Sequence, residues 1–218
     1  MSNLIYKWLK SENASSLETK RLAKKTRDAL HLTSKQYRKL LSWGREKEKV
    51  LEVLMSANRW NEIDFSKIPS KAGLVYKNAF ARRDIIAKKY EHFAKDKDTK
   101  VNAAALYPYE VVAKARPQYS WFSGFQALAE TDRATINKYW ENLPDYLNGA
   151  NSNILCVVDT SGSMTSDYDT SVRPIDVAIS LGLYCAERNK GAFANHYISF
   201  ASKPQLIATS GYDFVDKV

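Results

Sequence analysis

The sequence predicts a mainly α-helical N-terminal module over residues 1–150, followed by a partial α/β segment over residues 151–218. Apolar residues recur at helical intervals through the first part, without a strand pattern of useful length. From Ile154 the pattern changes to a continuous apolar run, a mostly apolar helix and two short strands. The charge changes too. Residues 151–218 hold 5 of the 33 Lys and Arg and 7 of the 24 Asp and Glu, so the first part is strongly basic and the second slightly acidic.

The size and composition of the chain favour a soluble, globular protein. Its 218 residues and its hydrophobic fraction of 44% allow a buried core. No stretch approaches the roughly 20 apolar residues of a membrane-spanning helix, and the first residues show no signal-peptide pattern. We therefore expect a cytoplasmic protein. Cys156 and Cys185 have no Cys or His at metal-ligand spacing, which favours buried free thiols.

Two capping patterns mark the first long helices. Ser15–Glu18 has the serine and the glutamate of a capping box, before apolar residues at helical spacing. Thr33–Gln36 has the same spacing and predicts a long helix that continues toward Ala57, with Gly44 as its weak point.

Prolines and polar tracts divide the rest of the helical module. Pro69 starts an amphipathic pattern that reaches Phe93. After the polar tract Lys95–Lys100, Pro108 and Pro117 break the chain into shorter helices.

The last helix of this module is expected to start at Thr131 or Asp132, whose side chains are suitable caps. It is expected to run to about Leu147 and to end at Gly149.

The C-terminal segment reads as strand, helix, strand, which is the opening of a doubly wound sheet. Ile154–Val158 is expected to be a buried strand, and residues 172–185 form a helix pattern. Tyr197–Phe200 and Gln205–Ala208 read as strands. Because only a short link containing Lys203-Pro204 separates them, we expect a hairpin with an antiparallel edge strand.

A metal-site pattern follows directly on the first of these strands, in Asp159–Met164. The order Asp-x-Ser-x-Ser at the carboxyl end of a strand supplies one carboxylate and two hydroxyls from a single turn, and hard divalent cations prefer oxygen ligands. The sequence therefore predicts Asp159, Ser161 and Ser163 as metal ligands, with Gly162 permitting the tight turn. The alternative is a hydrogen-bonded turn in which both serines cap the following helix.

Residue identity argues against three enzyme sites that also follow a buried strand. A haloacid-dehalogenase-type phosphatase needs a second Asp where Ser161 stands, and an aspartic protease needs the glycine one residue before Gly162. An esterase nucleophile elbow needs Gly-x-Ser-x-Gly, which this segment lacks. We expect no enzymatic activity, because no nucleophile and base can be paired from this sequence.

The segment Ile154–Met164 resembles the metal-ion-dependent adhesion site of the von Willebrand factor A-like fold. The resemblance implies a Mg²⁺ or Mn²⁺ site in which the Asp acts largely through water, both Ser hydroxyls bind directly, and later loops add a Thr and another Asp. An ion with few charged ligands keeps an open position for the carboxylate of a protein partner.

The chain is expected to carry roughly the first third of such an A-like domain, so the further ligands would lie beyond Val218 and cation binding would be weakened. Three nearby carboxylates are candidates to replace them, but a loop and a helix start explain these residues more simply: Asp167, Asp169 and Asp176. With the elements beside the Asp159 strand missing, we expect exposed apolar surface and a free sheet edge. This predicts low stability, self-association or completion by another chain.

The whole chain carries further distinctive segments: Lys7–Asn13, Tyr37–Leu41, Trp60–Phe65, Ile68–Ser70 and Ala105–Tyr109. Together they resemble the uncharacterised phage and large-virus proteins grouped as domain of unknown function 2828. The resemblance covers nearly all of the chain and implies a helical module joined to a C-terminal A-like domain. For a viral protein, the expected compartment is the cytoplasm of the host cell.

The same layout resembles the Ro autoantigen proteins, in which helical repeats and an A-like domain bind small structured RNA. Basic residues that would contact nucleic acid cluster in the first two long helices: Lys20, Arg21, Lys24, Lys25, Arg27, Arg38 and Lys39. Trp43, Trp60 and Tyr119–Phe122 would stack on bases if they were exposed. The alternatives are solvated helix faces for the charges and core packing for the aromatic residues.

Two functions follow from these patterns. The leading hypothesis is a non-enzymatic interaction protein whose cation site binds an acidic group on a protein partner. The alternative is binding of RNA or single-stranded nucleic acid by the basic helical module.

Overall fold

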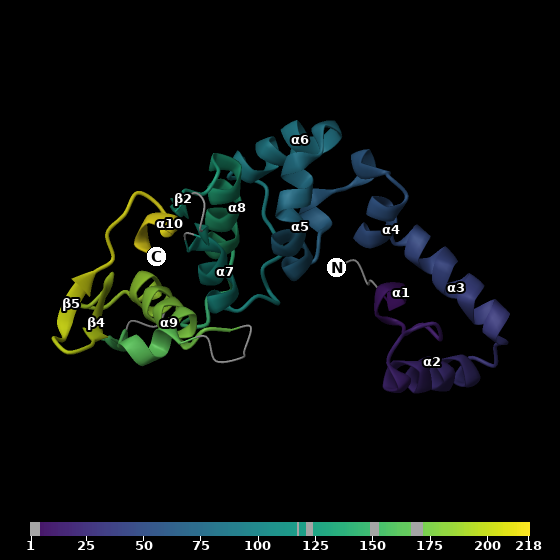
Figure 1. The fold of residues 1–218 in the computed structure, drawn as a ribbon, viewed down its shortest axis with the longest axis horizontal. Helices are drawn as coiled ribbons and strands as arrows, with labels where there is room; N and C mark the ends of the chain where they lie inside the picture. Colours follow the sequence, from purple (N-terminus) through teal and green to yellow (C-terminus); the bar gives the residue numbers. More distant parts are fainter. Residues whose placement is uncertain (1–4, 117, 121–123, 149–152, 167–171) are drawn as a thin grey trace. The chain divides into compact units, whose positions relative to one another are not determined.

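Most of the described chain is helical in the computed structural model (Figure 1). The structure describes residues 5–116, 118–120, 124–148, 153–166 and 172–218. It divides into two compact units, Met1–Asp64 and Phe65–Val218. Within the described ranges, none of the helices combines the length and the apolar character needed to cross a bilayer.

The first unit is a small helical assembly. Its elements are α1 (Ile5–Trp8), α2 (Leu17–Ala29), α3 (Ser34–Lys47), α4 (Leu51–Ser56) and the 3-10 turn η1 (Trp60–Glu62). The side chain of Ser16, not Ser15, caps α2 by accepting from the N–H of Thr19. Thr33 and Gln36 form the predicted capping box at the start of α3.

The long helix predicted to reach Ala57 is two helices. The chain leaves α3 at Glu48 and turns at Lys49, whose φ of 49° lies in the left-handed region and ends a helix. Gly44 is not the break. It lies inside α3 because the ring of Tyr6 packs on it, and a Cβ at this position would lie 2.1 Å from that ring. The glycine marks a close approach between α1 and α3.

The core of the first unit is small. Ala23, Tyr37 and Leu41 are buried together, with Leu9 and Leu32 packed against them. The hydroxyl of Tyr37 donates to the carbonyl of Lys10 at 2.8 Å, so this buried polar group is satisfied.

In its described residues, the second unit contains helices, two 3-10 turns and two small sheets. The helices are α5 (Ser70–Arg82), α6 (Asp84–Lys95), α7 (Pro108–Ala115), α8 (Glu130–Glu141), α9 (Pro174–Arg188) and α10 (Phe214–Lys217). The 3-10 turns are η2 (Phe65–Lys67) and η3 (Gly162–Thr165). The strands are β1 (Gln118–Ser120), β2 (Gly124–Gln126), β3 (Cys156–Asp159), β4 (His196–Phe200) and β5 (Gln205–Ala208).

Several predicted helix boundaries are wrong. The pattern from Pro69 to Phe93 is divided at Arg83, whose extended backbone separates α5 from α6. Helix α8 has Ala129 at its N-cap position, without a capping side chain, instead of Thr131 or Asp132. It ends at Glu141 rather than near Leu147, because Pro144 cannot continue a helix.

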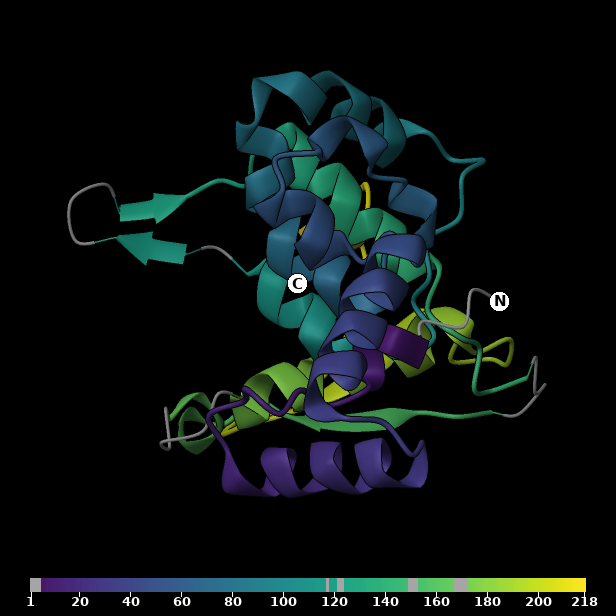
Figure 2. The ribbon, with the colours of Figure 1, turned by 90° about the vertical axis from the view of Figure 1, so that its right-hand side faces the viewer.

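Residues 1–150 are predicted to be entirely helical, but this part of the chain also contains two short strands. β1 and β2 form an antiparallel hairpin in which Tyr119 pairs with Phe125 (Figure 2). Strands of three residues are too short to show an alternating pattern in the sequence, although aromatic residues favour extended backbone.

The predicted strand, helix, strand arrangement is present. The sheet has the order β3-β4-β5, with β3 parallel to β4 and β4 antiparallel to β5. Helix α9 connects β3 to β4, as a parallel pair requires. The expected hairpin with an edge strand is β4 and β5.

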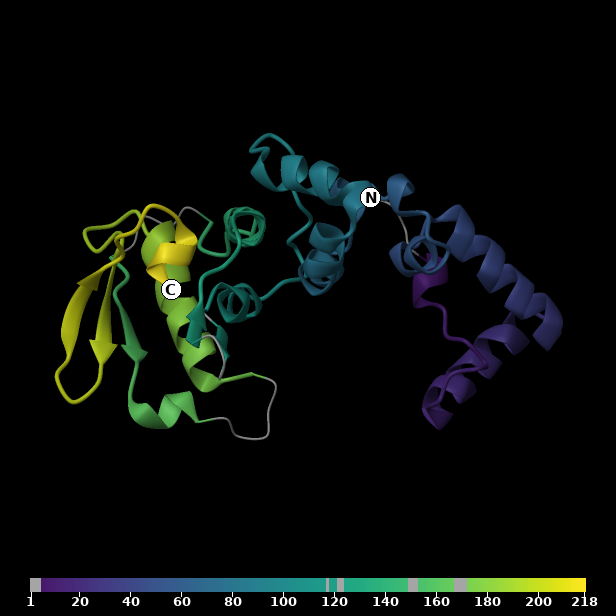
Figure 3. The ribbon, with the colours of Figure 1, turned by 45° about the horizontal axis from the view of Figure 1, so that its top comes forward.

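Helix α9 lies along one face of this sheet (Figure 3). On the other face Val157, Phe200 and Leu206 are 63%, 54% and 60% exposed. The expectation of a fully buried first strand is therefore wrong, because only Val158 of β3 is buried under α9. Self-association or a complementing chain at this exposed apolar surface stays a prediction.

One core joins residues from both sides of position 150. Trp140 of α8 stacks on Phe214 of α10 with ring centroids 3.9 Å apart, and Tyr184 of α9 meets Trp140 edge to face. Buried residues of α7 and α9 belong to the same cluster, including Val112 and Leu183. The predicted boundary between modules therefore falls inside one compact unit.

Candidate functional site

Close packing between α9 and β3 holds the strand that carries the predicted metal ligands. A Cβ on Gly182 would lie 2.4 Å from Cγ2 of Val158, so only glycine lets the helix approach so closely. Asp159 ends β3, and the N–H of Thr160 donates to the carbonyl of Phe200 at 2.9 Å. The turn after Asp159 is thus attached to both β3 and β4.

The structure brings the three predicted ligands together. The hydroxyl oxygens of Ser161 and Ser163 are 3.1 Å apart, and the backbone N–H of Ser161 donates to Oδ1 of Asp159 at 2.9 Å. This donation holds the pKa of Asp159 below its ordinary value. The carboxylate is therefore ionised at neutral pH.

The oxygen positions fit a small hard cation. Two neighbouring ligands of octahedral Mg²⁺, each about 2.1 Å from the ion, lie about 3 Å apart. The oxygens of Ser161 and Ser163 are 3.1 Å apart because the two hydroxyls form a hydrogen bond, and this separation is also close to that of such a pair. Neither at this turn nor elsewhere in the described ranges is a group of three or more His, Cys, Asp or Glu side chains placed to hold a metal. An ion at this turn would depend on the serine hydroxyls.

The capping alternative finds little support in the described turn. Ser161 occupies the N-cap position of η3, but its side chain makes no capping hydrogen bond. The turn is closed instead by Thr165, whose hydroxyl donates to the carbonyl of Gly162 at 2.6 Å. A Cβ on Gly162 would meet nothing within 4 Å, and its φ is not in the left-handed region. Gly162 is expected to permit the tight turn, but the turn uses neither the left-handed backbone nor the missing side chain of this glycine.

The nearby carboxylate Asp176 is engaged elsewhere. It is 3% exposed, and its two oxygens lie 2.6 Å from Nη1 of Arg116 and 3.2 Å from Nε of Arg173. It is therefore an ion-pair partner between α7 and α9 and not a substitute metal ligand. Asp167 and Asp169 lie outside the described residues.

The predicted nucleic-acid-binding residues divide into two groups. The exposed group comprises Lys20, Arg21, Lys24 and Lys25 on α2 and Arg38 and Lys39 on α3. None of these six forms an ion pair within the part of the chain that the structure describes. Arg27 differs, because it lies 2.7 Å from Glu12 and 2.6 Å from Asp28. Arg27 therefore stabilises the first unit.

The aromatic residues proposed to stack on bases also differ in exposure. Trp43 is 58% exposed and contacts Tyr6 edge to face, whereas Trp60 is 4% exposed. The core-packing alternative thus holds for Trp60 and fails for Trp43. Of the segment Tyr119–Phe122, Trp121 and Phe122 lie outside the described residues.

The two cysteines are free thiols, as predicted, although both are half-buried. Burial, together with a hydrogen bond to Cys156, raises the pKa of Cys185 to about 11. This thiol is therefore protonated and a poor nucleophile at neutral pH.

One candidate site is absent from the sequence-based predictions. A pocket of about 460 Å³ lies beside α5, α7 and α8, with Lys77, Arg82 and Lys114 in its wall. Lys77 and Arg82 lie on α5 and Lys114 lies on α7, at irregular spacing along the chain, so no linear sequence motif predicts the pocket. Only packing of the helices brings them to one cavity.

Comparison with known proteins identifies families but no activity. Residues 1–151 match the family model described as Domain of unknown function (DUF2828), and residues 153–218 match Domain of unknown function (DUF7788). No solved structure matches the chain.

A relative supports the large-virus part of the predicted resemblance. The chain is 34% identical over 231 aligned positions to "Uncharacterized protein L728" of Acanthamoeba polyphaga mimivirus. The alignment covers 99% of this chain and 38% of that protein, so the chain spans well under half of the relative's length. Because the family model matches residues 1–151 and the viral relative is similar over nearly the whole chain, the chain belongs to the DUF2828 family.

Proposed function

We propose that the chain is a non-enzymatic interaction protein whose A-like segment binds a protein partner through a divalent cation. Asp159, Ser161 and Ser163 would hold Mg²⁺ or Mn²⁺. The observation that carries the proposal is the 3.1 Å approach of two serine hydroxyls beside an ionised carboxylate at the end of β3. The strand, helix, strand order of β3, α9 and β4 supports the A-like interpretation.

The residues of the turn have separate roles in this proposal. Asp159 supplies the only negative charge among the three, and Ser161 and Ser163 supply neutral oxygens. When bound, the ion provides a positive centre with exchangeable positions, which suits the carboxylate of an acidic partner. Packing of α9 on β3 through Gly182 and Val158 holds the strand, so the turn keeps its geometry before binding.

Replacing Asp159 by Asn is expected to weaken Mn²⁺ or Mg²⁺ binding at least about tenfold, because a neutral amide replaces the only charged ligand. Ser163→Ala should weaken it as well. Isothermal titration calorimetry of the full chain measures the effect. Asp98→Asn removes the same charge from an exposed loop and should leave cation binding unchanged.

The proposal for the cation site fails if the unmodified chain takes up neither ion at millimolar concentration. It also fails if Asp98→Asn and Asp159→Asn weaken uptake equally, because binding would then follow net charge and not the turn.

A second function is favoured by the exposed cations of α2. Lys20 and Lys24 are four residues apart, as are Arg21 and Lys25, so the four side chains share adjoining faces of the helix. Without carboxylate partners in the described chain, they are available to phosphates. We propose RNA or single-stranded nucleic acid as the ligand of this surface.

Replacing these four residues of α2 by Gln is expected to make RNA binding weaker and less sensitive to salt. For a single strand, four lost phosphate contacts lower the slope of log K against log salt by about 2.8. Fluorescence anisotropy with an RNA oligonucleotide over a KCl series measures the slope, and a chelator should not change it. The matched control removes four exposed lysines of the second unit: Lys88, Lys97, Lys100 and Lys190. If the slope is unchanged in the α2 variant, the four residues of α2 do not contact the RNA phosphates.

A further inference from the structure

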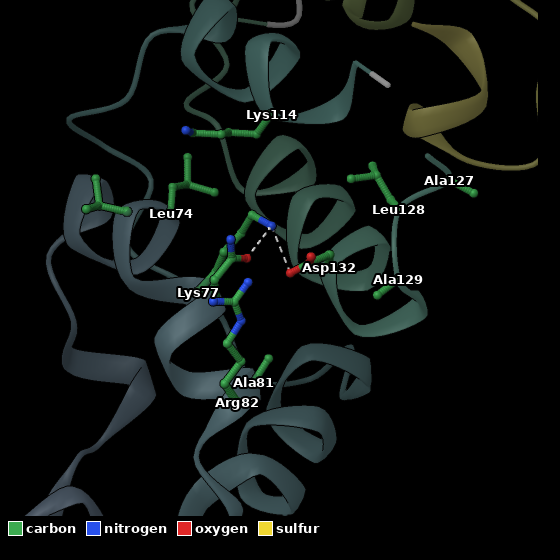
Figure 4. Close-up of a pocket in the computed structure, with 11 residues that line it drawn as sticks. Leu74, Lys77, Ala81, Arg82, Lys114, Ala127, Leu128, Ala129 and Asp132 are labelled. Carbon is green, nitrogen blue, oxygen red and sulfur yellow. Dashed lines mark hydrogen bonds and ion pairs between the residues drawn. The ribbon is translucent and has the colours of Figure 1, made fainter. Parts of the chain in front are cut away.

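A pocket in the second unit has the size and charge of a small-molecule site. It lies beside α5, α7 and the start of α8 (Figure 4), and its volume of about 460 Å³ falls in the usual range for small ligands. It shares no residue with the Asp159 turn or with the basic face of α2.

Positive charge dominates the pocket wall. Lys77 and Arg82 come from α5 and Lys114 from α7, against one carboxylate, Asp132. Arg82 and Lys114 are exposed, and neither has an ion-pair partner in the ranges that the structure describes. After Lys77 is balanced by Asp132, the wall keeps a net charge of about +2.

Lys77 is fixed in position. It is 8% exposed, its Nζ lies 2.8 Å from Oδ1 of Asp132, and it donates to Oδ1 of Asn78 at 3.1 Å. Figure 4 shows the side chains of Lys77 and Asp132 directed toward each other. Of the three hydrogens of the ammonium group, one is donated to Asn78, whereas the contact with Asp132 is an ion pair in which Oδ1 accepts no hydrogen bond. Lys77 therefore keeps hydrogens that it can donate to a ligand while it stays beside Asp132.

The start of α8 presents backbone N–H groups to the pocket, and its first turn also carries the carboxylates Glu130 and Asp132. Ala127–Ala129 line the pocket, and α8 begins at Glu130. Because Ala129 provides no capping side chain, the first N–H groups of this helix have no side-chain acceptor from the cap position. The N-terminus of a helix of 12 residues favours an anion nearby.

Part of the remaining wall is apolar, beside the amide of Asn78. Leu74 is 4% exposed, and Leu128 and Ala81 also line the cavity. A ligand that combines an anionic group with a flat or apolar body would contact both kinds of surface. We infer that this pocket binds a phosphorylated small molecule of about the size of a mononucleotide, with Arg82 and Lys114 contacting the phosphate. A guanidinium pairs with two phosphate oxygens at once, and a dianion matches the charge of the wall.

Calorimetry of the full chain with three probes tests the inference. The probes are adenosine 5′-monophosphate, adenosine and inorganic phosphate. The monophosphate should bind more tightly than either of the other two, because only it satisfies both the cations and the apolar wall. The double variant Arg82→Gln/Lys114→Gln should lose at least about tenfold in affinity for the monophosphate.

The matched control Lys88→Gln/Lys190→Gln removes the same charge from exposed sites outside the pocket and should bind as the unmodified chain does. The single variants Arg82→Gln and Lys114→Gln are measured as well, so a folding defect in the double variant, seen by circular dichroism, does not decide the result. Equal binding of adenosine and its monophosphate, an equal loss in the control, or no binding of any probe by the unmodified chain would overturn the inference.

Discussion

Replacing Arg116 by Met is expected to lower the free energy of unfolding of the second unit by about 1.5–3 kcal/mol, the usual contribution of a hydrogen bond to a charged group. Arg116, directly after α7, holds Asp176 of α9, with Nη1 and Oδ1 2.6 Å apart and the Asp176 side chain only 5% exposed. The substitution leaves this carboxylate buried with Arg173 alone, whose Nε is 3.2 Å away. Removing one partner of a buried pair is costly because the other charge cannot regain water.

The charge on Asp176 makes the interpretation testable. The double variant Arg116→Met/Asp176→Leu removes the buried carboxylate itself, so most of the lost stability should return. Urea unfolding followed by circular dichroism measures both effects. Lys71→Met breaks the exposed pair with Glu110 and should leave the midpoint nearly unchanged. If the double variant is as unstable as Arg116→Met, the loss comes from side-chain packing and not from the buried charge.

Local patterns were sufficient to predict the elements whose ends depend on neighbouring residues. The capping box of Thr33 and Gln36 and the order of β3, α9, β4 and β5 are of this kind. Gly44 was misread because its role depends on the Tyr6 ring, 38 positions earlier in the chain, and not on helix propensity. The β1 and β2 hairpin was missed because three residues give no measurable periodicity.

The candidate sites show the same division. Asp159, Ser161 and Ser163 were found because one turn holds all three, so their spacing along the chain is also their geometry. The pocket with Lys77 and Lys114 was not found, since its residues meet only when α5 packs beside α7 and α8. The exposure of Trp43 and the burial of Trp60 likewise follow from packing, which composition does not record.

Trp140→Ala is expected to destabilise the second unit by about 3–5 kcal/mol. Trp140 is 2% exposed and stacks on Phe214, and its Nε1 donates to Oε2 of Glu187 at 2.6 Å. The tryptophan lies in the segment matched by DUF2828, whereas Phe214 and Glu187 lie in the segment matched by DUF7788. Removing the Trp140 side chain should therefore lower the stability of both segments together.

A double-mutant cycle with Phe214→Ala should give a coupling energy of about 0.5–1.5 kcal/mol for the stacked rings. Differential scanning calorimetry should show one transition for the second unit, shifted as a whole by Trp140→Ala. Trp43→Ala, at a 58% exposed position in the first unit, is the control and should leave that transition in place. Two separate transitions within residues 65–218, only one of them moved by Trp140→Ala, would mean that the two family segments fold independently. A single shifted transition means that Trp140 and Phe214 make them one folding unit, so truncation at the family boundary would expose the core that both segments share.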